Sequence, residues 1–144
     1  MKNILIFTTL LFALCHVAAA SDSLTLELGR SNDPGMIELT FRNASKAPVE
    51  LEIPVEGAGN CDKYFEIEAV TTEGETARKS FLYAPGIDPY TVKLKARGVY
   101  VHRIHPGAYL NGAELKTLQK LRVKYTNPLT GASVLSDWLV LTEM

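Results

Sequence analysis

The fold is decided by residues 36–55, MIELTFRNASKAPVELEIPV. Apolar residues alternate with polar ones over residues 37–42, and the alternation resumes at Val49. A period of two is typical of strands with one buried face, and the polar stretch 43–48 between the two halves indicates a reversal. The stretch therefore predicts two neighbouring strands of an antiparallel sheet, which need further strands to cover their apolar faces.

The chain of 144 residues begins with a pattern typical of an export signal. Lys2 is followed by an apolar run over residues 4–17, and residues 18–20 are alanines suited to a cleavage site. The run is shorter than the roughly 20 apolar residues that span a bilayer. We expect residues 1–20 to be a signal peptide and residues 21–144 to be one secreted or periplasmic domain, with no membrane span after cleavage. Lipid attachment at Cys15 is the disfavoured alternative, because the bulky Leu14 precedes it.

Cleavage after Ala20 leaves Cys61 as the single cysteine. We expect it to be a free thiol or to pair between chains. No recognisable nucleophile signature surrounds Cys61, so we expect no catalytic role and no cofactor. The formal net charge of −1 argues against nucleic acid as a partner.

Short segments with turn residues between them run through the rest of the chain, four of them alternating (24–28, 65–70, 91–96 and 121–125) and the others interpreted as strands. They lie at residues 24–28, 65–70, 77–83, 91–96, 99–105, 121–125 and 134–141. A short helix is expected near residues 112–119, with Asn111 as its cap. Together the segments predict an all-β fold, an antiparallel β-sandwich of about seven to nine strands. The only tryptophan, Trp138, lies in an apolar segment and is expected in the core.

The order of these features resembles the immunoglobulin-like modules of secreted bacterial proteins, including non-catalytic domains of some secreted metallopeptidases. The residues that carry the resemblance are Asn43, Pro48-Val49, Phe65-x-Ile67, Gly74, Leu94, Gly98 and Leu121-x-Val123-x-Tyr125. The Cys…Trp…Cys spacing of antibody domains is absent. The resemblance implies an immunoglobulin-like sandwich and an accessory or binding role, and it transfers no functional residues.

Two short motifs have a chemical reading and a structural one. His102 and His105 form H-x-x-H, but in a strand residues three apart face opposite sides, and a zinc site needs three or four ligands. We therefore expect no metal site and read both as polar strand-end residues. Asn43-Ala44-Ser45 matches a glycosylation sequon, and we interpret Asn43 as a turn residue.

Charges are segregated along the sequence. Residues 50–75 carry eight acids and one base, and residues 78–124 carry ten bases and two acids. The structural reading is that acidic strands pair beside basic ones on outward faces. The functional reading is a pair of oppositely charged patches that steer a partner. We favour the structural reading.

The sequence favours a non-catalytic binding or accessory module that acts on a protein partner. Candidate contact residues are the cations Lys93 and Lys95 and the tyrosines of the later segments, Tyr83, Tyr90 and Tyr109, which lie with Tyr100 in or near loops. A carbohydrate-binding module is the first alternative, and it would need aromatic rings exposed on a sheet face. A proteinase inhibitor that acts through loop 84–89 is the second.

Overall fold

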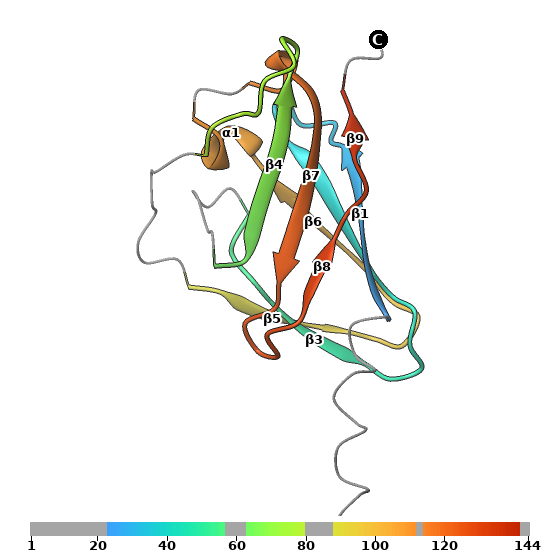
Figure 1. Cartoon of the computed structure of the whole chain (residues 1–144). Helices are drawn as coiled ribbons and strands as arrows, with labels where there is room; N and C mark the ends of the chain where they lie inside the picture. The colour runs from blue at the N-terminus through green and yellow to red at the C-terminus, as the bar shows by residue number, and fades with distance from the viewer. Residues whose placement is uncertain (1–22, 57–62, 80–87, 112–113, 142–144) are drawn as a thin grey trace, which may run out of the picture.

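The structure, a computed structural model, describes residues 23–56, 63–79, 88–111 and 114–141. Within these ranges it contains nine strands, one short helix and one 3-10 turn (Figure 1). They are β1 Leu24–Arg30, β2 Ile37–Asn43, β3 Val49–Ile53, β4 Phe65–Thr71, β5 Tyr90–Leu94, β6 Val99–Ile104, α1 Pro106–Tyr109, η1 Leu115–Thr117, β7 Leu118–Thr126, β8 Ser133–Leu135 and β9 Leu139–Val140. All strand pairings are antiparallel, so the expected all-β sandwich is confirmed.

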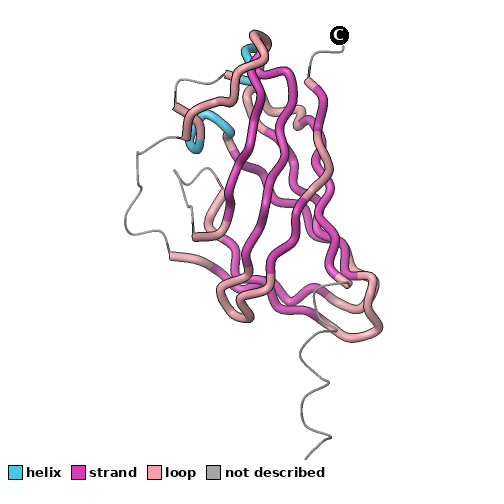
Figure 2. Tube along the Cα trace, viewed as in Figure 1, coloured by secondary structure: helices cyan, strands magenta, loops and turns pink. Residues whose placement is uncertain are grey.

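The strands form two main layers and a smaller pair. One layer has the order β1-β2-β6, and the other has the order β4-β7-β8, with β9 also paired to β7. The two-stranded sheet β3-β5 crosses the lower end of both layers in Figures 1 and 2. The apolar faces of all three sheets meet in one core.

The stretch that decides the fold forms strands β2 and β3 as predicted, but they do not pair with each other. Strand β2 pairs with β1 and β6, while β3 pairs with β5. Strands β5 and β6 also follow each other in the chain without pairing, because β5 pairs with β3 and β6 pairs with β2. The turn between β2 and β3 therefore lies against the turn between β5 and β6. We call this pair of stacked turns, residues 44–48 and 95–98, the arch. Splaying turns the apolar faces of β2 and β3 toward the same core, which a flat hairpin would leave open to water.

Asn43 holds the arch together. Its side chain is buried, and its Nδ2 donates to the carbonyl oxygens of Ala47 at 2.7 Å and Lys95 at 3.0 Å. Its Oδ1 accepts from the backbone and hydroxyl of Ser45 at 3.0 and 2.7 Å. One side chain therefore satisfies polar groups of both turns, which fixes the angle at which the hairpins splay. Asn43 is the last residue of β2 and not a turn residue as the sequence indicated, although its side chain bonds to both turns.

Strand β3 is tied to the opposite layer by side chains of β7 and of the turn after it. Tyr125 donates from its hydroxyl to the carbonyl oxygen of Glu52 at 2.9 Å. Asn127 is buried, and its Nδ2 donates to the carbonyl oxygen of Glu50 at 2.8 Å. These bonds satisfy the edge of β3 that does not face β5, so the small sheet is joined to the sandwich.

Two expected elements differ from the observed ones. The helix expected near residues 112–119 is reduced to the 3-10 turn η1, and the α-helix lies earlier, at α1, where Pro106 occupies the first turn. The return strand expected at 77–83 is represented by single bridges, from Thr76 to Val70 and from Lys79 to Leu110, and residues 80–83 lie outside the described part of the chain.

Candidate functional site

The last strand contains a bulge that decides where Trp138 points. Strand β8 pairs with β7 through Leu135 and Lys124, whereas β9 pairs with it through Leu139 and Leu121. Three residues of the last strand thus lie opposite two residues of β7. Without the extra residue, Trp138 would lie opposite Leu121, whose side chain is buried. A bulge shifts the register by one and reverses which side chains face inward.

Trp138 is consequently on the surface, and the expectation of a core tryptophan is wrong. Its side chain is 38% exposed. Leu139 takes the place that regular pairing would have given to Trp138 and packs against the core. Ser136 fixes the bulge, because its hydroxyl accepts from the backbone N–H of Val123 at 3.0 Å and donates to the carbonyl of Asp137 at 2.9 Å.

The indole rests against two cations of the neighbouring strand. Lys120 Nζ lies 4.8 Å from the ring centroid, and the Arg122 guanidinium carbon lies 4.7 Å from it. Both cations are on the outward face of β7, two residues apart, so the ring lies across their side chains. Leu135 and Val140, 49% and 48% exposed, flank it on the last strand. We call Leu135, Trp138, Val140, Lys120 and Arg122 the Trp138 face.

Acids of β4 border the same surface. Glu68 accepts from Arg122 at 2.7 Å, and Glu66 lies 3.7 Å from Lys124. Glu50 of β3 likewise lies opposite Lys93 of β5 in the sheet register. The structural reading of the charge segregation is therefore confirmed, since acidic strands lie beside basic ones. Arg122 is held between Glu68 and the indole, which orients both its charge and the ring.

The contact residues predicted from the sequence do not gather at one place. Lys93, Lys95 and Tyr90 are exposed on or beside β5, and Tyr90 bonds through its hydroxyl to that of Tyr100. Tyr109 is buried in α1, with its ring 6.5 Å from that of Phe65, so it is no part of a surface. Tyr83, Cys61 and most of loop 84–89 lie outside the described residues.

His102 is a core residue and not a polar strand end. Only 1% of it is exposed, and its ring stacks on Phe65 with centroids 5.6 Å apart. Burial lowers the pKa of His102 to about 4, so the ring is neutral near neutral pH. His105 is exposed and lies beyond the end of β6, at the start of α1. Within the described ranges, no three or more His, Cys, Asp or Glu side chains gather as metal ligands would.

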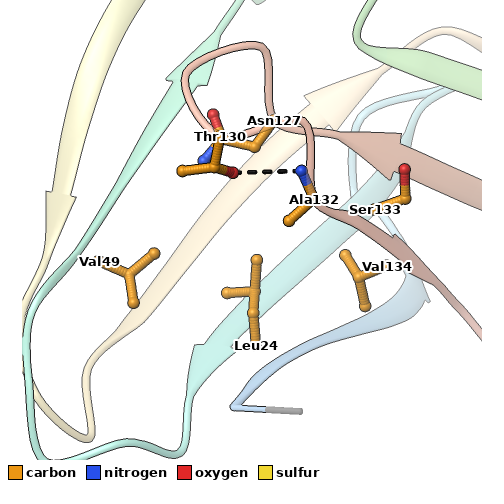
Figure 3. Close-up of a pocket in the computed structure, with 7 residues that line it drawn as sticks. All are labelled: Leu24, Val49, Asn127, Thr130, Ala132, Ser133 and Val134. Carbon is orange, nitrogen blue, oxygen red and sulfur yellow. Dashed lines mark hydrogen bonds between the residues drawn. The ribbon is translucent and has the colours of Figure 1, made fainter. Parts of the chain in front are cut away.

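A small pocket lies where β1 begins, near the turn between β7 and β8 (Figure 3). Leu24, Val49 and Val134 form its apolar walls, and Thr130 accepts from the backbone N–H of Ala132 at 3.2 Å on its rim. Its volume is about 50 Å³, whereas ligand pockets typically measure about 300–1,000 Å³. The Trp138 face is therefore the stronger candidate site.

The sequence matches no protein-family model and no curated protein. No helix in the described part of the chain is both long and apolar enough to cross a membrane.

Proposed function

We propose that this chain is a secreted or periplasmic, non-catalytic module that binds a protein partner through the Trp138 face. The observation that carries the proposal is the outward indole, 38% exposed and braced by Lys120 and Arg122. Tryptophan and arginine dominate the binding energy of protein interfaces when less polar contacts surround them and exclude water. Leu135 and Val140 are placed to supply those contacts.

The braced indole favours a protein over a flexible ligand because its orientation is set before binding. Arg122 bonds to Glu68 and contacts the ring, so neither side chain has to be ordered by the partner. Ordering a side chain on binding costs about 0.5–1.5 kcal/mol, and that cost is reduced here. The resemblance to immunoglobulin-like accessory modules supports the same role.

Carbohydrate binding is the second candidate, because an aromatic ring exposed on a sheet face is the feature such a module would need. Trp138 provides that feature, because it is exposed and not in the core as the sequence indicated. We rank it second because Leu135 and Val140 on the same strand are aliphatic and Arg122 beside the ring is already bonded to Glu68, which leaves few hydrogen-bonding groups for sugar hydroxyls.

A capture experiment tests the proposal. The exported protein is immobilised and exposed to the secreted or periplasmic fraction of its own source, beside Trp138→Ala and the control Val101→Ala. Val101 is an exposed valine, 42% accessible, on β6 of the other layer. We expect wild type and Val101→Ala to retain a common partner and Trp138→Ala to lose it.

Other outcomes distinguish the alternatives. Equal capture by Trp138→Ala and wild type would contradict the proposal. Loss of binding to a glycan array in Trp138→Ala, with no protein captured by any variant, would establish the carbohydrate reading instead. Thermal melts of all three proteins exclude misfolding as the cause of a loss.

A further inference from the structure

A second surface lies at the arch, remote from the Trp138 face. Four exposed cations gather there on two stacked turns and the strand beside them. They are Lys46, Lys93, Lys95 and Arg97, which we call the arch cations. We propose that the arch cations bind the surface of a membrane that contains anionic lipids. This inference is independent of the protein-binding role proposed above.

The arch brings the cations together by backbone contacts. The N–H of Arg97 donates to the carbonyl of Ser45 at 3.3 Å, and Asn43 bonds to carbonyls of both turns. The two turns are therefore in direct contact, and the three cations on them share one end of the molecule. Lys93 lies two residues before Lys95 on β5 and extends the group along the strand.

Within the described ranges, these cations differ from most of the others because none of them lies within 4.0 Å of a carboxylate oxygen. Arg42, Arg103, Arg122 and Lys124 each lie within 4.0 Å of a carboxylate oxygen. Like charges on adjoining turns repel one another, and an anionic surface would relieve this repulsion at Lys46, Lys95 and Arg97, whereas Lys93 already lies opposite Glu50 in the sheet register.

The backbone conformation of Arg97 is a second, independent observation at the arch. Its φ is +60°, and it is the one non-glycine residue with positive φ in the described part of the chain. Glycine or asparagine is the usual residue in this left-handed conformation. An arginine at this position is less favourable for the backbone than glycine or asparagine would be.

The position of the amino-terminal chain favours a membrane as the anionic partner. Ser23 accepts from the N–H of Ala44 at 2.6 Å, so the polypeptide enters the domain directly beside the arch. The apolar run of residues 4–17 ends six residues before Ser23. Six residues span at most about 20 Å. Before the cleavage expected after Ala20, a bilayer that held this run would have its headgroups within about this distance of the arch.

The composition of the arch fits an electrostatic contact. The residues between the cations are small, Ala47, Pro48 and Ala96, and no large exposed apolar side chain lies within the two turns. A protein interface needs a desolvated apolar centre, which the Trp138 face has and the arch lacks. Headgroups need only charge, and each basic residue close to an anionic membrane strengthens binding by about 5-fold.

Vesicle co-sedimentation tests the proposal with the exported protein. One set of vesicles contains phosphatidylcholine alone, and the other contains phosphatidylcholine mixed with phosphatidylglycerol. We expect binding to the mixed vesicles only, and we expect added salt to weaken it because salt screens exposed charges. Lys46→Glu/Lys95→Glu should weaken this binding by roughly 25-fold or more, at about 5-fold for each residue.

The matched control reverses two cations at the other end of the domain, Arg78→Glu/Lys79→Glu. Both are exposed, lie beside residues 110–111 after α1, and have no carboxylate oxygen within 4.0 Å among the described residues, and the net charge changes by the same amount. We expect this control to lose markedly less affinity than the arch variant. An equal loss in both double variants would overturn the proposal, as would equal binding to the two kinds of vesicle or no binding to either.

Arg97→Asn separates binding from folding. Asparagine tolerates the left-handed conformation, so the melting temperature should stay the same or rise. Because the charge is lost, affinity for mixed vesicles should fall by about 5-fold. Wild-type affinity in this variant would contradict the assignment of Arg97, whereas weaker binding by an equally stable protein supports it.

Discussion

The stretch around β2 and β3 and the stretch around β8 and β9 are both rich in apolar residues, yet only the first buries its largest ring. Phe41 of β2 is fully buried, while Trp138 between β8 and β9 is 38% exposed. Strand β2 pairs in one unbroken register, and the last strand shifts its register by a residue at the bulge. Alternation shows which side chains share a face, and the register on the partner strand decides which face is covered.

The largest loss of stability is expected at Phe41, the fully buried ring. Phe41→Ala should reduce the free energy of unfolding by roughly 3–5 kcal/mol, the range for truncating a fully buried aromatic side chain. Its ring packs edge-on against Tyr125 with centroids 5.0 Å apart, so the substitution leaves a cavity in the core. Denaturant melts measure the loss. A loss below that of Trp138→Ala would break the comparison between the two stretches.

The pH dependence of stability should follow from His102, which lies opposite Leu39 of β2. Its pKa is lowered to about 4 by burial, so the unfolded chain binds the proton more readily between about pH 6.5 and pH 4. Stability is therefore complete above about pH 6.5 and falls as the pH drops toward 4, by roughly 3 kcal/mol in total.

Melts of wild type and His102→Phe across this range check the assignment. Phenylalanine keeps an aromatic ring against Phe65 and removes the titrating group. The difference in unfolding free energy between the two proteins should change with pH in the stated window. A constant difference would show that His102 does not titrate in this way.

A smaller loss is expected at the arch. Asn43→Ala removes the bonds to Ala47, Lys95 and Ser45 and should cost about 2–3 kcal/mol, because carbonyl groups of both turns lose their donor. Asn43→Asp should be no better, since a carboxylate cannot donate to those carbonyls. Asn32→Ala, in an exposed turn, is the control and should change stability little in urea melts.

The smallest loss of stability should come from Trp138→Ala. The ring is partly exposed, so truncation removes the contacts with Lys120 and Arg122 and about 1–2 kcal/mol of stability. Chemical denaturation measures it directly. A loss as large as that of Phe41→Ala would mean that the indole is buried, and the Trp138 face would then have no centre.

Much of the fold follows from the sequence because strand alternation is a local property. The apolar residues of β2, β3, β4 and β7 are buried where the alternation indicates. The charge pairing of β4 with β7 also follows, since acidic and basic segments lie far apart in the chain and must be brought together on exposed faces.

The remainder depends on contacts that local patterns do not record. The pairing of β2 with β6 and the bonds of Asn43 across two turns join residues far apart in the chain, which the turn sequence alone does not reveal. The site at Trp138 was missed because the surrounding leucines and valines suggested one continuous buried strand. Ser136-Asp137 was the available signal, since two polar residues interrupt that apolar run and coincide with the bulge.

The burial of Asn43 has a consequence for producing the protein in a eukaryotic secretory host. Its Nδ2 atom, where an oligosaccharide would be attached, is already bonded to Ala47 and Lys95 inside the arch. Oligosaccharide transfer to the Asn43-Ala44-Ser45 sequon would therefore compete with folding and could succeed only on chains whose arch has not yet closed. Molecules that carry the sugar would keep only one Nδ2 hydrogen and could not donate to both carbonyls, so a heavier glycosylated band on a gel would report the fraction modified before the arch closed.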